Sequence, residues 1–101
     1  MKLKIANTFT KRLVGFMFQR PSCSLLLIPC RSVHTFFCLI DLDLYFLDKK
    51  GTVISALYNI KPWRKGIEVK EARMVLEIPS TSKMKFKIGQ NIFKDGGWEY
   101  L

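Results

Sequence analysis

The chain has 101 residues, of which 49% are hydrophobic and 25% are charged. This length corresponds to a single domain, and the composition is that of a globular protein with one core, which excludes a disordered chain. The net charge of +9 comes from 17 lysines and arginines that are scattered along the sequence. A dispersed basic excess attracts acidic ligands or partners but does not predict specific nucleic-acid binding.

The three cysteines are an odd number, which argues against a closed set of disulfides and favours a reducing compartment. Lys11 and Arg12 interrupt the apolar stretch near the N-terminus before it can form the core of a signal peptide. No apolar run reaches the roughly 18 residues of a membrane-spanning helix. We therefore expect a cytoplasmic monomer without membrane insertion and without a cofactor.

The first predicted elements are a short strand at residues 3–6 and a helix within residues 7–20. Four apolar residues recur there at the spacing of one helical face, which we expect to pack on the core: Phe9, Leu13, Phe16 and Met17. Asn7 or Thr8 can cap the first turn. Gly15 marks either a close contact or the helix end, because glycine inside a helix costs about 1 kcal/mol relative to alanine.

Short segments rich in branched and aromatic residues predict strands after this helix, at residues 24–28, 33–39, 43–48, 52–60 and 72–78. The residues "DKKG" at 48–51 predict a hairpin turn with Gly51 at a positive φ. In the strand at 72–78, alternation places Arg73 and Glu77 on the polar face. A helical turn and a last strand are expected within residues 80–92.

These elements predict a mainly β (α+β) domain over residues 1–94, most simply a small β-sandwich or barrel with one N-terminal helix and one short C-terminal helical turn. Residues 95–101, "DGGWEYL", are expected to be a flexible tail.

The order of several motifs resembles the domain-of-unknown-function family 192. The matching motifs, over residues 3–93, are "RLVGFMFQR", "LLLIPCRSVHTFF", "IDLDLYFLDKKGTVI", "KPWR", "VLEIP" and "IGQNI". The resemblance implies a compact, jelly-roll-like sandwich with a helix near the N-terminus and no established activity. It also implies, as possible partners, pilus or secretion-assembly components, because some members are encoded beside such genes.

The most persistent polar positions of that family match Arg12, His34, Thr35, Asp43, Asp48 and Arg64 in this chain. The sequence departs from the family pattern at Cys38, where methionine is usual, and at Asp41, where proline is usual. A glycine is also usual where Thr81 or Ser82 stands. The change at residue 38 removes any thioether ligand there, and the others are typical of turn variation.

The single histidine leaves several interpretations open. If residues 33–39 form a strand and Asp43 lies on its neighbour, His34 and Asp43 meet, and Cys30 joins them as the nucleophile of a small hydrolase. A zinc site is not expected, because residues four apart on a strand are ~13 Å apart. In the structural alternative, His34, Thr35 and Asp43 satisfy buried backbone groups.

The interpretation that we favour is a non-catalytic binding or accessory module. In "KPWR", Trp63 and Arg64 combine a flat aromatic ring with a guanidinium, which is typical of carboxylate or phosphate recognition. The predicted polar cleft binds an acidic ligand or partner protein through Arg12, His34, Thr35, Asp43, Trp63 and Arg64. Weak nucleic-acid binding through the basic surface is a second alternative.

Overall fold

The computed structural model describes residues 1–101, which form eight strands and two short helices. The strands are β1 (Lys2–Ala6), β2 (Ser24–Leu27), β3 (Ser32–Val33), β4 (Leu42–Leu47), β5 (Val53–Ile60), β6 (Ile67–Glu68), β7 (Met74–Pro79) and β8 (Glu99–Tyr100). The helices are α1 (Phe9–Val14) and α2 (Ile92–Asp95). The predicted mainly β class, with one N-terminal helix and a short C-terminal helical turn, is confirmed.

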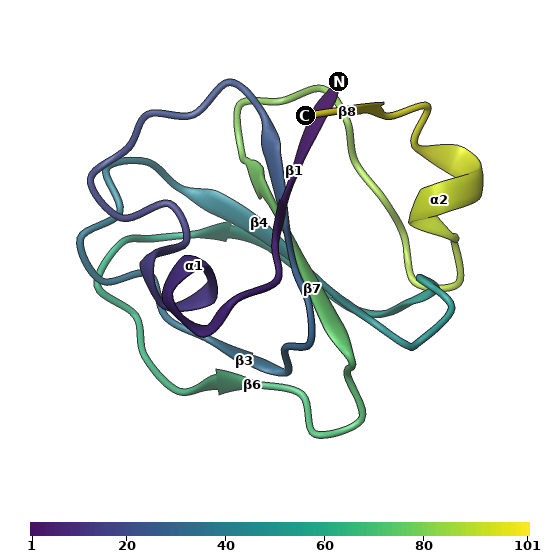
Figure 1. Ribbon diagram of the computed structural model, residues 1–101, viewed down its shortest axis with the longest axis horizontal. Helices are drawn as coiled ribbons and strands as arrows, with labels where there is room; N and C mark the ends of the chain where they lie inside the picture. The colour runs from purple at the N-terminus through teal and green to yellow at the C-terminus, as the bar shows by residue number, and fades with distance from the viewer.

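Six strands form one mixed sheet in the order β5-β4-β7-β2-β1-β8, and β3 and β6 form a separate two-stranded sheet. β1 runs parallel to β2 and β8, whereas β2, β4, β5 and β7 pair antiparallel. α1, β3 and β6 lie on one side of the large sheet, and α2 lies towards the opposite side (Figure 1). The two chain ends lie close together (Figure 1).

The large sheet carries a core on each face. On β4, Leu42, Leu44 and Phe46 face the cluster that also contains Phe16, Val33 and Ile67. Their neighbours Tyr45 and Leu47 face the second cluster, which contains Phe86 and Ile92. Because both faces are covered, β4 and β7 are buried along their whole length. Alternating residues of these strands therefore lie in two separate cores rather than in a core and in solvent.

The predicted hairpin at residues 48–51 is confirmed. β4 and β5 pair antiparallel, and Gly51 has a φ of 88°. The Asp48 side chain accepts hydrogen bonds from the amides of Lys50 at 2.8 Å and Thr52 at 3.0 Å, which holds the turn. These hydrogen bonds lower the pKa of Asp48, and the one from the Thr52 amide has the largest effect.

Three segments differ from the prediction. α1 ends at Gly15, so that Phe16 reaches the core from beyond the helix while Phe9 and Leu13 remain exposed. Strand β3 contains only Ser32–Val33, because the following residues bond to the loop that precedes β6. Residues 80–90 form neither a helix nor a strand.

The chain end is part of the sheet in place of the predicted loose tail. Lys2 and Leu3 of β1 pair in parallel with Glu99 and Tyr100 of β8. The indole of Trp98 donates a hydrogen bond of 2.8 Å to the carbonyl of Ile92. This pairing supplies the free edge of β1 with hydrogen-bond partners, which an exposed edge strand otherwise lacks. Both helices are much shorter than the roughly 20 apolar residues that a membrane-spanning helix needs.

Candidate functional site

A cavity of about 570 Å³ opens beside α1, on the face of the large sheet that carries the first core cluster. Its walls come from α1 and the residues after it, from the segment between β2 and β3, from β3 and the residues after it, and from residues before and within β7. Nine of its 17 lining residues are hydrophobic, and Glu77 is its only acidic one. Volume and lining are those of a site for a small molecule.

Glu77 lines this cavity and is almost completely buried. It belongs to β7, where its register partners are Leu25 and Leu44 of the first core cluster, and it is only 3% exposed. No hydrogen bond or ion pair reaches its carboxylate, and its Oε1 is buried without any partner. Burial raises the pKa of Glu77 to about 8, because the charged form loses its hydration. The group is therefore mainly protonated at neutral pH.

The backbone of Gly15 forms the wall beside Glu77. Thr8 caps α1 by accepting a hydrogen bond from the amide of Lys11, and Gly15 ends the helix with a φ of 51° and a ψ of −124°. A Cβ at position 15 would stand 3.6 Å from Oε1 of Glu77. This conformation is open to glycine but costly for other residues. The glycine therefore both ends the helix and leaves room next to the carboxyl group.

Three arginines belong to the wall of this cavity. Arg12 on α1, Arg31 and Arg73 line the same cavity, and none of them comes within ion-pair distance of Glu77. Arg31 pairs with Glu68 at 3.5 Å. Arg12 donates a hydrogen bond of 3.5 Å to the carbonyl of Ile28, while Arg12 and Arg73 form no ion pair. The cavity therefore offers cationic groups near solvent and a carboxyl group inside.

Two thiols also lie in the cavity wall. Cys30 donates a hydrogen bond of 3.3 Å to the carbonyl of Ser32, and Cys38 is buried. Burial raises the pKa of Cys30, and the nearby Glu77 adds to this, whereas the Ser32 contact and Arg12 oppose it. Burial and then Glu77 raise the pKa of Cys38 to about 11. Neither thiol has the lowered pKa of a cysteine nucleophile.

His34 lies at the edge of the cavity with both ring nitrogens engaged. Its Nε2 donates a hydrogen bond of 3.2 Å to the carbonyl of Leu13, and its Nδ1 accepts one of 3.1 Å from the amide of Phe36. These contacts join the end of α1 to the loop after β3. No three cysteine, histidine or acidic side chains converge in a geometry that would hold a metal ion.

Thr35 joins two loops and does not line the cavity. Its hydroxyl donates to the carbonyl of Lys61 at 2.7 Å and accepts from the amide of Arg64 at 2.9 Å. Its own amide donates to the carbonyl of Arg64, and its carbonyl accepts from Trp63. Thr35 is fully buried. These contacts agree with the structural alternative, in which Thr35 satisfies buried backbone groups.

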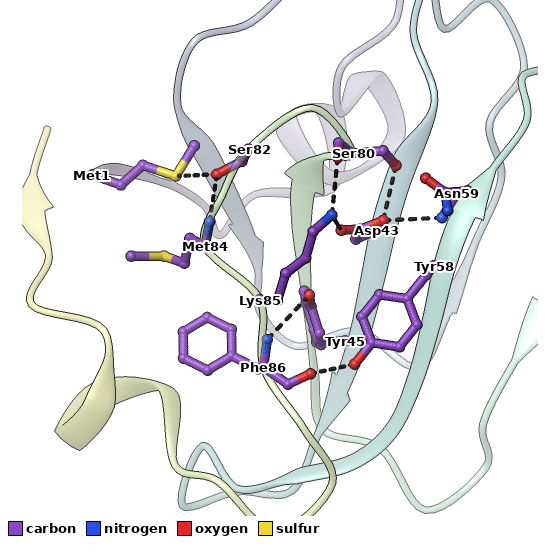
Figure 2. A network of polar contacts seen from close by, with 10 residues as sticks. All are labelled: Met1, Asp43, Tyr45, Tyr58, Asn59, Ser80, Ser82, Met84, Lys85 and Phe86. Carbon is purple, nitrogen blue, oxygen red and sulfur yellow. Dashed lines mark hydrogen bonds and ion pairs between the residues drawn. The ribbon is translucent and has the colours of Figure 1, made fainter.

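Asp43 does not meet His34, so the predicted group of Cys30, His34 and Asp43 is not assembled. Asp43 lies on β4 beside Tyr45, whose side chain faces the second core cluster, whereas His34 lies on the other side of the sheet. The buried Asp43 carboxylate accepts hydrogen bonds from the amide of Asn59 and the hydroxyl of Ser80, and it pairs with Lys85 (Figure 2). The prediction failed because the segment after Val33 is not a strand next to β4.

Trp63 and Arg64 are outside the cavity as well. Trp63 is 61% exposed and packs edge-on against Phe37, with ring centroids 4.8 Å apart, and Phe37 packs against Phe18 at 5.0 Å. All three aromatic residues have a positive φ. Of the predicted cleft residues, only Arg12 and His34 line this cavity, together with Cys30. Thr35, Trp63 and Arg64 contact one another outside it.

The sequence did not indicate that Glu77 is buried in a cavity wall, because its strand alternates as if one face were exposed to solvent. A signal was present, since Val75 shares the face of Glu77, and an apolar neighbour on a polar face indicates burial. The end of α1 and Phe16 cover that face. They lie about 60 residues away in the sequence, and periodicity does not report contacts between such distant segments.

The sequence matches the DUF192 family, described as Uncharacterized ACR, over residues 1–93. A UPF0127 protein from Pyrococcus abyssi is 33% identical over 99 residues, which cover 90% of this chain and 84% of that protein. A UPF0127 protein from Pyrococcus horikoshii is 36% identical over 92 residues, which cover 85% and 79%.

Among solved structures, a protein of unknown function from Novosphingobium aromaticivorans has a similar fold, with a TM-score of 0.69 and 19% sequence identity. The similarity covers 78% of this chain and 63% of that one. At this level of identity the likeness concerns the fold alone.

Proposed function

The chain belongs to the DUF192 family, and we propose that it is a non-catalytic module that binds a small organic carboxylate in the cavity beside α1. The observation that carries the proposal is the charge of this cavity. Three arginines line it, and two of them, Arg12 and Arg73, form no ion pair. The single acidic lining residue, Glu77, has its pKa raised to about 8 and does not neutralise them at neutral pH.

A guanidinium group binds a carboxylate through two parallel hydrogen bonds, which makes arginine the suited residue for such a ligand. The volume of about 570 Å³ lies within the range of small-molecule sites. The net charge of +9 also raises the local concentration of anions around the protein. A concave site of this volume favours a small acidic ligand over an acidic partner protein.

The same residues do not support the hydrolase alternative. Cys30 has a raised pKa, and both nitrogens of His34 are engaged with backbone groups. Asp43, the third member of that group, lies on the opposite side of the sheet. A nucleophile, a base and an orienting acid are thus not in mutual contact.

The test is a titration with 4-methylpentanoate, a branched aliphatic carboxylate, followed by calorimetry and by amide chemical shifts. We expect Arg12→Ala to weaken binding by about tenfold or more, because it removes a charge-assisted contact. Arg20→Ala, an exposed arginine outside the cavity, is the matched control and should bind like the parent protein. Arg64→Ala should do the same.

Loss of binding in Arg64→Ala but not in Arg12→Ala would place the site at residues 61–64 and overturn the proposal. Absence of any chemical-shift change at residues of the cavity wall would also overturn it. Arg12 is half-exposed and on a short helix, so its replacement leaves the core intact.

A further inference from the structure

The buried carboxyl group of Glu77 lacks a hydrogen-bond partner. A carboxyl group that is 97% removed from solvent normally has hydrogen-bond partners, and this one has none. Burying a polar group without a partner costs stability, yet the chain places no lysine, hydroxyl or amide against it. The group faces the cavity, so a bound molecule is what can supply the missing donor.

The donor that suits this position best is an ammonium group. An ionised carboxylate in a buried site binds a cation with several N–H groups more strongly than a neutral donor. The arginines of the wall are too far from Glu77 to fill this role. The cavity therefore suits a ligand with two opposite charges. Its cationic group contacts Glu77, and its anionic group lies near Arg12.

Arg12 and Glu77 line the same cavity without forming an ion pair. The guanidinium and the carboxyl group therefore leave space between them, and a ligand with two opposite charges can contact both.

The remaining wall is apolar. Phe9 is 74% exposed and Leu13 is 53% exposed on α1, and both line the cavity together with Val14 and Phe16. Exposed aliphatic and aromatic side chains at the mouth of a cavity favour a ligand with an apolar part. This part has room in a volume larger than a charged headgroup needs.

We propose that the ligand is an α-amino acid with an apolar side chain, which places its ammonium group on Glu77 and its carboxylate on Arg12. The inference rests on the proposed carboxylate-binding function and adds the cationic group and the apolar group. An α-amino acid carries both charges on a small scaffold, which a cavity of about 570 Å³ can hold together with an apolar side chain.

Binding should be coupled to release of a proton. Other charged or titratable groups line the same cavity: Arg12, Cys30, Arg31, His34, Cys38 and Arg73. Of the groups whose pKa is shifted, only Glu77, at about 8, lies near neutral pH. Glu77 is thus protonated in the free protein at pH 7 and must ionise to pair with ammonium. Calorimetry in buffers of different ionisation enthalpy should show release of about one proton per ligand.

The decisive comparison uses L-leucine and three analogues on the unmodified protein. 4-Methylpentanoate lacks the ammonium group, 2-hydroxy-4-methylpentanoate replaces it with a hydroxyl, and 3-methylbutylamine lacks the carboxylate. We expect leucine to bind at least about tenfold more tightly than each analogue, since each lacks one charged contact. Glu77→Gln should abolish the advantage over 4-methylpentanoate, and Glu99→Gln, an exposed glutamate on β8, should retain it.

The outcomes separate the two proposals. If 4-methylpentanoate binds as tightly as leucine, or no proton is released, the amino-acid inference is overturned and the carboxylate function stands. If 3-methylbutylamine binds as tightly as leucine, or none of the four compounds binds, both are overturned. The analogue series and the proton count need no variant, so the inference is testable even if Glu77→Gln folds poorly.

Discussion

Gly15 lies directly against Glu77, with the position of a Cβ at residue 15 only 3.6 Å from Oε1 of the glutamate. The residue that ends α1 therefore also borders the buried carboxyl group. A glycine needed for the backbone and a carboxyl group without a partner are two independent features that lie in contact with each other. Their coincidence supports the proposed ligand site at the end of α1.

Gly15→Ala should lower both stability and ligand affinity. The backbone at φ 51° and ψ −124° is strained for any residue with a Cβ, which costs about 1–3 kcal/mol. The methyl group would also occupy space beside Glu77. Denaturant unfolding and a 4-methylpentanoate titration measure the two effects. Gly66→Ala, at a φ of 68° with nothing within 4 Å, should lower stability alone; equal affinity losses in both variants would contradict this assignment.

The stability of the free protein should fall as the pH rises from about 5 to 8. The pKa of Glu77 is raised from 4.5 to about 8, so in this interval the unfolded chain ionises while the folded protein keeps its proton. The unfolded state then binds fewer protons, and the free energy of unfolding decreases by as much as about 1.4 kcal/mol per pH unit. Above pH 8 both states are ionised and this contribution is constant.

Glu77→Gln removes this pH dependence because glutamine does not titrate. Denaturant unfolding between pH 5 and pH 9 should therefore give a flatter curve for Glu77→Gln than for the parent protein. Glu99→Gln, which changes an exposed glutamate, should keep the parent slope. Parallel curves for the parent and Glu77→Gln would show that the glutamate is hydrated and ionised throughout.

Alkylation of Cys30 by iodoacetamide should be slow at pH 7 and should accelerate only at a higher pH than that of an ordinary thiol, because burial raises the pKa of Cys30. Cys38, with a pKa of about 11, should react more slowly still. Peptide mass spectrometry resolves the two sites. Saturating L-leucine should slow the reaction of Cys30, which lines the cavity. Rapid reaction of Cys30 at pH 7 would instead restore the nucleophile hypothesis.

Asp43→Asn should destabilise the protein without changing ligand affinity. The buried carboxylate accepts hydrogen bonds from Asn59 and Ser80 and pairs with Lys85, and losing contacts to a charged group costs about 1.5–3 kcal/mol. Asp41→Asn is the matched control, because its pair with Lys61 is largely exposed and should contribute at most about 1 kcal/mol. A weaker ligand affinity in Asp43→Asn would contradict its placement away from the cavity.

Local patterns in the sequence were sufficient for part of the fold. Turn residues between two apolar runs predicted the β4–β5 hairpin, since Asp48 and Gly51 act within four residues of each other. The ordered motifs also identified the family, and two of the six predicted cleft residues, Arg12 and His34, line one cavity. Each of these inferences depends on residues that are close in sequence or on a complete motif.

The tertiary structure alone decided which face of the sheet each polar residue occupies and what covers that face. Alternation along β7 places Glu77 and Leu76 on opposite faces of the sheet. Only the packing of α1 and Phe16 turns the face of Glu77 into the wall of a cavity. Contacts between distant segments also keep Asp43 and His34 apart, because the loop after β3 forms hydrogen bonds with residues 61–64 and not with β4. Side-chain periodicity is a local property of the backbone, whereas burial depends on segments that meet only after folding.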